Sequence, residues 1–222
     1  MSEGYEIPLD LIRFEHRLDR FANAMHRGRA KIVAIGSSST EGVGASSKAW
    51  SYPYRLEVEL RGKFPRMSVE VQNKGIGGQE AGDEVRRFDT DVFAIDPHLV
   101  VWQIGTNAIV RPADFDFDAV KGAITRGLNC LNDRNFDVIL MDPQYAGQVT
   151  DHPGHADMID FISSTAADAK INVFRRFRLM QHCVGEKGVP VEQLINPDRL
   201  HQNDWGYLNV TRALARAIEA AL

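Results

Sequence analysis

The chain has 222 residues, of which 44% are hydrophobic and 25% are charged, a composition typical of a globular protein with a sizeable core. A formal net charge of −4 lacks the basic excess that non-specific nucleic-acid binding needs, and no apolar run is long enough to span a membrane. Two cysteines are too few for a disulfide framework. The first eight residues lack the basic start and apolar core of a secretory signal, so we expect a cytoplasmic protein.

The first part of the chain predicts a helix followed by a buried strand. Apolar residues recur at helical spacing between residues 9 and 27, so the segment 1–30 is expected to supply a leading amphipathic helix. Ile32 to Ile35 then form a short run, rich in β-branched residues and ended by Gly36, which is typical of a strand buried on both faces. Four hydroxyl residues follow this strand directly: Ser37, Ser38, Ser39 and Thr40.

The rest of the chain alternates strands with helices. Further strands are predicted at 67–72, 99–104, 136–141 and 171–174, and further helices at 51–63, 80–88, 116–134, 156–169, 175–183 and, at the C-terminus, 205–221. This alternation predicts right-handed crossovers and a parallel sheet of about five strands between layers of helices. We therefore expect one α/β domain over residues 1–222.

The carboxyl ends of parallel strands share one edge of a sheet, and open α/β sheets bind their ligands at that edge. The predicted strands bring four loops to it: residues 37–40, 73–78, 105–107 and 142–145. A hydroxyl group at this edge can act as a helix cap, a phosphate ligand or a nucleophile. The function of the protein depends on which of these roles applies.

A hydroxyl nucleophile needs a base within hydrogen-bond reach and a third group that orients the base. Among seven histidines, His201 stands out because Asp198 precedes it by three residues, just before the final helix. On a turn, this spacing can bring the carboxylate to Nδ1 of the imidazole and leave Nε2 ready to accept a proton. Taken alone, Asp-x-x-His is a weak motif that also occurs by chance on surfaces.

An oxyanion formed by nucleophilic attack needs hydrogen-bond donors that are rigid before the reaction begins. Gly77 and Gly78 lie in a glycine-rich turn and lack side chains that would block their backbone N–H groups. Asn107 offers a side-chain amide at the end of the third strand. Each also has a purely structural interpretation, since Gly78 can serve a backbone with positive φ and Asn107 can cap the next segment.

Four blocks of sequence, taken together, resemble the SGNH (GDSL-type) hydrolases in their order and spacing. The blocks are Gly36-Ser-Ser38-Ser-Thr-Glu-Gly42, Asn73-Lys-Gly-Ile-Gly-Gly78, Gly105-Thr-Asn107 and Asp198-Arg-Leu-His201, and the resemblance spans residues 31–207. It implies a flavodoxin-like, three-layer α/β/α sandwich. It also implies ester hydrolysis with no metal and no other cofactor.

The resemblance assigns expected roles to five residues. Ser38 occupies the position of the nucleophile, Asp198 that of the orienting acid and His201 that of the base. Gly78 and Asn107 match the glycine and asparagine of the oxyanion hole, to which Ser38 adds its own N–H. The implied reaction is acyl transfer through an acyl-enzyme.

Two positions depart from the family pattern. The aspartate that usually precedes the nucleophile is Ser37 here, and the aspartate that usually follows the oxyanion asparagine is Ala108. Neither belongs to the catalytic set, but both replacements change the hydrogen bonds that support the loops. Ser37 and Ser39 are also rival nucleophiles, although only Ser38 keeps the register with Gly36 and Gly42.

The leading hypothesis is a serine-dependent hydrolase whose partner is a small-molecule ester, namely a small acyl or acetyl ester, including esters of carbohydrates. An O-acyltransferase that uses the same site with a sugar acceptor is the first alternative. A non-catalytic, flavodoxin-like module that binds a ligand through the serine-rich loop is the second. Gly42-Val-Gly44 is too short for a dinucleotide fingerprint, and no Gly-Lys-Ser/Thr follows it.

Other conspicuous residues favour structural roles. The arginines of residues 174–178 could grip an acidic substrate, but we expect a solvated helix face. His152 and His155 lie near two aspartates, which suggests a metal, yet Pro-Gly between them favours a mobile loop. We interpret residues 143–155 as a lid over the site. The three tryptophans are expected in the core or in a pocket wall: Trp50, Trp102 and Trp205.

Overall fold

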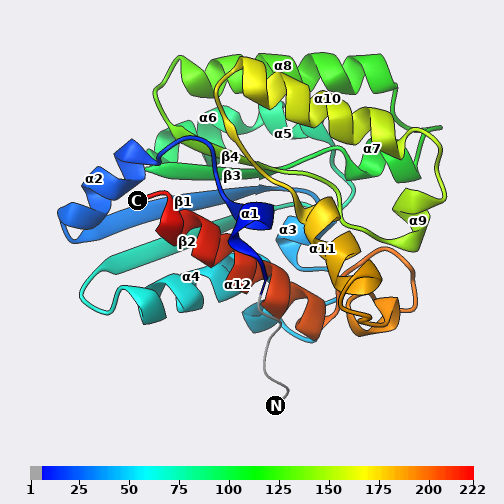
Figure 1. The fold of residues 1–222 in the computed structure, drawn as a ribbon. Coiled ribbons are helices and arrows are strands. Elements are labelled where there is room, and N and C mark those ends of the chain that lie inside the picture. Colours follow the sequence, from blue (N-terminus) through cyan, green and yellow to red (C-terminus); the bar gives the residue numbers. More distant parts are fainter. Residues whose placement is uncertain (1–6) are drawn as a thin grey trace.

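The computed structural model describes residues 7–222, which form a parallel sheet between layers of helices (Figure 1). The sheet has the order β2-β1-β3-β4-β5, and every neighbouring pair is parallel. This is the flavodoxin-like order of a doubly wound fold. The predicted fold class, including a sheet of five strands, is therefore confirmed. The strands are β1 (Arg29–Gly36), β2 (Ser68–Gly75), β3 (Leu99–Gln103), β4 (Asp137–Met141) and β5 (Asn172–Phe174).

Helices cover both faces of the sheet. One face carries α5, α8 and α10, and the other carries α4 and α12 (Figure 1). The longer helices are α2 (Asp19–His26), α4 (Tyr52–Lys63), α8 (Phe117–Asn132), α10 (His155–Asp168), α11 (Arg176–Gly185) and α12 (Asp204–Ala220). The shorter ones are α1 (Leu9–Ile12), α3 (Ser38–Glu41), α5 (Ala81–Arg86), α6 (Phe88–Asp91), α7 (Thr106–Val110), α9 (Gly147–Thr150) and the 3-10 turns η1 (Lys48–Trp50), η2 (Phe93–Ile95) and η3 (Val191–Gln193). In the part of the chain from residue 7 onward, none of these helices has the length and apolarity to cross a membrane.

The strands at the centre of the sheet are buried on both faces, as their sequences predict. Ile32 to Ile35 of β1 and all five residues of β3 are buried. Trp102 of β3 is fully buried and stacks edge-on against Phe88, with ring centroids 5.1 Å apart. Helices above and below leave no solvent-facing side, which explains why these strands read as apolar runs rather than alternating patterns.

The predicted leading helix is two short helices, α1 and α2, separated by non-helical residues 13–18. The cause is a tertiary contact. The side-chain oxygen of Asn172, on β5, accepts the backbone N–H groups of Glu15 and His16, and its amide donates to the His16 carbonyl at 2.8 Å. These bonds satisfy the backbone without a helix. The part of the predicted segment before residue 7 lies outside the described residues.

Three other predicted boundaries shift. The helix expected at 80–88 ends at Arg86, and a separate helix begins at Phe88, which is buried against Trp102. Strand β2 continues to Gly75, so residues 73–75 belong to the strand rather than to the glycine-rich turn. The segment 143–155, which we interpret from the sequence as a lid, contains the short helix α9.

Two glycines of α8 provide a test of core packing. A Cβ at Gly127 would lie 2.3 Å from Cη2 of the buried Trp102 ring, whereas a Cβ at Gly122 would meet only the flexible end of Arg126. We expect Gly127→Ala to lower the free energy of unfolding by about 1–3 kcal/mol, through overpacking. Gly122→Ala should raise it by about 0.5–1 kcal/mol because alanine favours a helix interior. Urea unfolding measures both, and equal shifts in the two variants would contradict this packing.

Candidate active site

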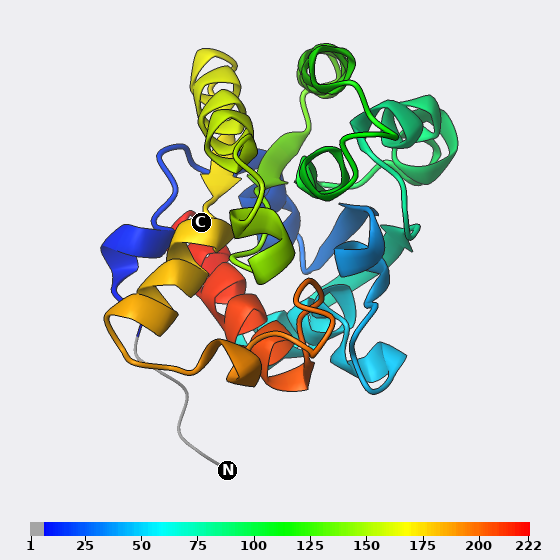
Figure 2. The same ribbon diagram turned by 90° about the vertical axis from the view of Figure 1, so that its right-hand side faces the viewer.

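The carboxyl ends of the strands meet at one edge, which Figure 2 views face on. Ser38 begins α3, directly after β1 and next to the point where the sheet order turns from β1 to β3. That turning point is where doubly wound folds form a crevice. The loop before α12 reaches the same edge and carries Asp198 and His201 (Figure 2). Residues from the beginning and the end of the chain are thereby brought together.

Three side chains at this edge form a continuous hydrogen-bonded chain. Ser38 Oγ lies 2.9 Å from His201 Nε2, and His201 Nδ1 lies 2.7 Å from Asp198 Oδ2. An ionised carboxylate can only accept, so Nδ1 must carry the proton of the neutral imidazole. Nε2 is then the acceptor for the Ser38 hydroxyl. This arrangement can transfer a proton away from a hydroxyl group as that group attacks an electrophile.

The turn of residues 198–201 holds its own carboxylate. Asp198 Oδ1 accepts the backbone N–H groups of Leu200 and His201 at 2.9 and 3.0 Å. Partial burial opposes ionisation of Asp198, but these N–H groups and the His201 imidazole outweigh it and lower the pKa of Asp198 below its ordinary value. The acid is therefore kept in the charged form that orients and stabilises a protonated imidazole.

The two hydrogen-bond donors that the sequence predicts follow β2 and β3 at the same edge of the sheet. Gly78 adopts a φ of +82°, a backbone region that favours glycine. Asn107, in α7, is buried and donates one amide proton to the Gln79 carbonyl at 2.7 Å. Its amide group has a second N–H. The N–H of Gly77, by contrast, donates to Glu41 Oε2 at 2.7 Å, so this glycine serves the loop rather than an incoming oxygen.

Only one of the neighbouring hydroxyl groups contacts the imidazole. Ser37 is buried and donates through its Oγ to Gln103 Oε1 at 3.0 Å. Ser39 is buried as well, and Thr40 Oγ1 also lies within reach of Gln103 Oε1, at 3.3 Å. The replacement of the usual aspartate by Ser37 fits this surrounding, since Gln103 Oε1 needs donors and a carboxylate has none.

A buried row of polar side chains connects the nucleophile loop to the base loop. Ser37 N–H donates to Gln103 Oε1, and Gln103 Nε2 donates to Thr106 Oγ1. Thr106 in turn donates to Gln144 Oε1, and Gln144 Nε2 donates to the carbonyl of Leu200 at 3.0 Å. The row therefore passes beneath the site from the neighbour of Ser38 to the neighbour of His201. The sequence predictions missed Gln103 and Gln144, although both occur where a predicted strand ends.

Arg176 anchors this row and overturns a prediction. We expected the arginines of residues 174–178 on a solvated face, but Arg176 is fully buried. Its guanidinium donates to Gln144 Oε1 at 2.8 Å and to the Asp142 carbonyl at 3.0 Å. Because a cation faces Gln144 Oε1, the amide of Gln144 must point its NH₂ group at Leu200. Burial raises the pKa of the Asp142 side chain to about 7 and lowers that of Arg176.

The segment interpreted as a lid packs against the turn that bears the acid. Gln148 of α9 donates through its backbone N–H to the Arg199 carbonyl at 3.0 Å and through its side chain to the Asp198 carbonyl at 2.7 Å. Arg199 also pairs with Asp151 at 2.7 Å. The role of a lid remains a prediction, while these contacts show that the segment supports Asp198.

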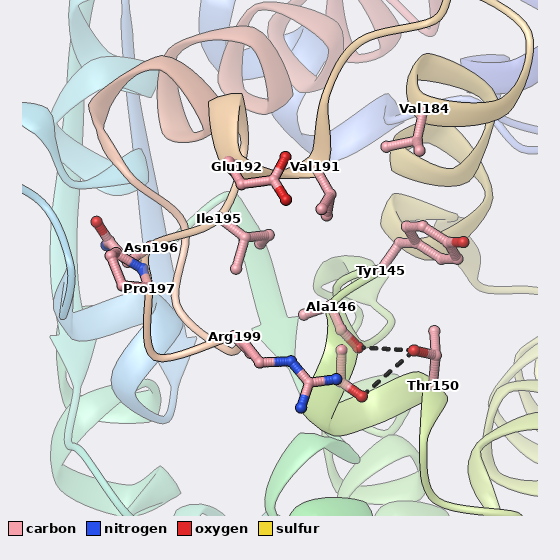
Figure 3. Close-up of a pocket in the computed structure, with 11 residues that line it drawn as sticks. Tyr145, Ala146, Thr150, Val184, Val191, Glu192, Ile195, Asn196, Pro197 and Arg199 are labelled. Carbon is pink, nitrogen blue, oxygen red and sulfur yellow. Dashed lines mark hydrogen bonds between the residues drawn. The ribbon is translucent and has the colours of Figure 1, made fainter.

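A pocket of about 510 Å³ adjoins the same turn (Figure 3). Pro197 and Arg199, which flank Asp198, form one side, and Tyr145 and Val184 lie across the opening from Pro197 (Figure 3). The walls are mostly apolar, with a few polar groups. The other lining residues are Ala146, Gly147, Thr150, Val191, Glu192, Ile195 and Asn196.

The two histidines of the loop are engaged in local contacts. His152 Nδ1 accepts the N–H of Gly154, and His155 Nδ1 lies 2.7 Å from the His152 carbonyl. Their rings stack on Phe117 and Phe177, respectively. Within residues 7–222, no group of three histidine, cysteine, aspartate or glutamate side chains is placed to hold a metal ion. Trp102 lies in the core as predicted, and Trp50 and Trp205 are half-buried.

Comparison with known proteins adds a family and several relatives. The model of a family described as non-GDSL lipase-like matches residues 5–222. An acetylxylan esterase of Geobacillus stearothermophilus is 32% identical over 90 residues, and the uncharacterized lipoprotein YqeF of Bacillus subtilis is 34% identical over 82. These alignments cover 40% and 36% of this chain, but only 38% and 33% of the relatives' own lengths.

Solved structures share the fold. A two-domain esterase active on acetylated mannans superposes with a TM-score of 0.81 at 18% identity, over 98% of this chain and 57% of that one. A variant of an acetyl xylan esterase from Geobacillus stearothermophilus superposes with a TM-score of 0.72 at 23% identity, over 85% of this chain and 94% of that one. At these identities the likeness concerns the fold.

Because Ser38 alone among the four hydroxyl residues touches His201, it should be the reactive one. Treatment with an organophosphonate, followed by mass spectrometry, should place the covalent adduct on Ser38 and leave Ser37 and Ser39 unmodified. His201→Ala should slow labelling by at least about 10²-fold, since the base would be lost. Ser164, on the surface of α10, is the control residue. An adduct on Ser37 or Ser39 would show that the hydrogen-bonded chain is not the reactive group.

Proposed function

Because the chain belongs to the non-GDSL lipase-like family, we propose that it is a serine-dependent carboxylic ester hydrolase that removes small acyl groups from carbohydrate esters. The observation that carries the proposal is the chain of hydrogen bonds from Ser38 through His201 to Asp198. The family match agrees with the resemblance to SGNH hydrolases that the four sequence blocks predict. The acetylxylan esterase and the acetylmannan esterase among the relatives support a carbohydrate ester as the substrate.

In the first half of the proposed reaction, Ser38 Oγ attacks the ester carbonyl while His201 Nε2 takes the hydroxyl proton. The imidazolium that forms is stabilised by Asp198, whose pKa is already low. The tetrahedral oxyanion is received by the N–H of Ser38, the N–H of Gly78 and the second amide proton of Asn107. Collapse of this intermediate breaks the bond to the alcohol, and His201 returns the proton to the leaving oxygen.

In the second half, His201 removes a proton from a water molecule that attacks the acyl-Ser38 ester. The same oxyanion donors act again, and the acid product leaves with Ser38 restored. A transferase would differ only here, with a sugar hydroxyl in place of water. The relatives of known activity are esterases, which favours water as the acceptor.

The pocket of Figure 3 is proposed to receive a part of the alcohol that lies away from the ester bond, because neither Ser38 nor His201 lines it. It lies beside the turn that carries Asp198, and its volume is in the range of sites for small ligands. The ring of Tyr145 offers an apolar face, while Asn196, Glu192 and Arg199 can exchange hydrogen bonds with hydroxyl groups. An acetylated sugar combines the two kinds of surface.

Hydrolysis of p-nitrophenyl acetate tests the reaction. Purified protein should release p-nitrophenol and acetate, and Ser38→Ala should lower kcat by at least about 10³-fold, because the nucleophile is lost. Ser164→Ala, which changes a hydroxyl on the surface of α10, should retain the wild-type rate. Equal rates from Ser38→Ala and wild type would remove Ser38 from the mechanism, and a product acylated on an added oligosaccharide would point to a transferase.

A bulky side chain placed in the pocket of Figure 3 tests whether this pocket binds the alcohol part of the substrate. Val184→Trp should raise KM for acetylated xylooligosaccharides by about 10-fold, since the indole would occupy space that the sugar needs. The same variant should hydrolyse p-nitrophenyl acetate at nearly the wild-type rate. Val58→Trp, on the exposed side of α4, is the control for added bulk. An unchanged KM for the oligosaccharide would place its binding elsewhere.

A further inference from the structure

A buried carboxylate lies directly beside the two oxyanion donors. Glu80 follows Gly78 by two residues and is only 2% exposed. Its Oε1 accepts the N–H of Gly105 at 2.9 Å and that of Ala81 at 3.0 Å, and its Oε2 accepts the N–H of Ala108 at 2.9 Å. All three of these partners are backbone N–H groups, so the carboxylate organises the path of the chain.

Two of these N–H groups flank Asn107. Gly105 and Ala108 lie on either side of it at the start of α7, so Glu80 holds the backbone of Asn107 from both sides. The backbone carbonyl of Gln79, the residue before Glu80, accepts a hydrogen bond from the side-chain amide of Asn107 at 2.7 Å. Residues 79 and 80 together therefore fix both the backbone and the side chain of this donor. They also continue directly from the turn that presents the Gly78 N–H.

The chemistry of these contacts needs a carboxylate. Both oxygens face N–H donors, and a side-chain amide in the same place would turn an NH₂ group towards Gly105 or Ala108. Glu80 also caps the N-terminus of α5, where an acidic side chain is favourable, and Asp83 completes the capping box. Burial raises the pKa of Glu80, and the N–H groups of Ala108, Gly105 and Ala81 offset part of this rise.

We propose that Glu80 is a positioning residue of the oxyanion site, which holds the Gly78 turn and the Asn107 helix at a fixed separation. The proposal rests on the proposed function, because the donors matter only if an oxyanion forms between them. At position 108, where the family pattern has an aspartate and this chain has alanine, the backbone N–H donates to the carboxylate of Glu80 on the neighbouring loop.

Glu84 provides a matched control. It lies one turn further along α5 and is fully buried, but its Oε2 accepts the indole N–H of Trp102 at 2.6 Å. Its other oxygen has no hydrogen-bond partner among the described residues. Glu84 thus contacts the core beneath the sheet edge rather than the loops of the site. Burial, and then the neighbouring Glu80, raise the pKa of Glu84 well above its ordinary value, so Glu84→Gln replaces a buried carboxyl group without touching Gly105 or Ala108.

The test compares Glu80→Gln with Glu84→Gln in ester hydrolysis, with active-site concentrations set by organophosphonate titration. Glu80→Gln should lower kcat by about 10- to 10²-fold with KM nearly unchanged, because loss of one preorganised oxyanion donor costs about 10²–10³-fold. Glu84→Gln should keep the wild-type kcat. Glu80→Asp, which keeps the charge, should recover part of the loss. Equal losses in Glu80→Gln and Glu84→Gln would overturn the proposal.

A double-mutant cycle separates positioning from general damage. If Glu80 acts through Asn107, then Glu80→Gln should have almost no further effect on kcat in an Asn107→Ala background. Fully additive losses would overturn the proposal. Amide hydrogen exchange gives a readout that needs no turnover: Gly105 and Ala108 should lose protection in Glu80→Gln but not in Glu84→Gln. If wild type cleaved no ester, the proposed function would fail, whereas unchanged exchange would reject Glu80 itself.

Discussion

The hydrogen bond between Ser38 and His201 is the contact on which the rest of the site depends. It joins residues 163 positions apart, at 2.9 Å, and it exists only because five parallel strands end at one edge. The strand order 2-1-3-4-5 leaves a crevice beside β1, where Ser38 begins its helix. The last loop of the chain must cross to that crevice to supply the imidazole. The strand order therefore determines where Ser38 and His201 can meet.

Buried polar groups connect the loops at the edge of the sheet, beside apolar residues of the core such as Ile104 and Val149. The row from Ser37 through Gln103 and Gln144 fixes the loops next to Ser38 and His201, and the buried Arg176 fixes the orientation of its last amide. Groups of this kind are costly to bury unless each is satisfied. Most of the cost is offset here by partners, although Nη1 of Arg176 has none among the described residues. Rigid donors are what an oxyanion site requires.

Much of the fold could be predicted because its signals are local. The buried strands read as apolar runs, and the four blocks mark the loops at their ends. The breaks in helices could not be predicted, since the interruption after Ile12 depends on Asn172, a residue of the last strand. Arg176 looked like a surface residue because charge is usually solvated, and only the tertiary partners Gln144 and Asp142 explain its burial. Glu80 could not be identified for the same reason, since only its contacts with Gly105 and Ala108 distinguish it from the other acidic residues.

The large sequence separation between Ser38 and His201 also has a consequence for biosynthesis. During translation, Ser38 and the loops that carry Gly78 and Asn107 emerge long before the turn of residues 198–201, so a partly made chain holds the Ser38 hydroxyl without the His201 imidazole. Contacts between such distant parts of the sequence carry a large entropic cost of loop closure and slow folding. On the proposed mechanism, the reactivity of Ser38 arises only when the turn of residues 198–201 docks on the edge of the sheet. The acquisition of serine reactivity during folding then reports this docking.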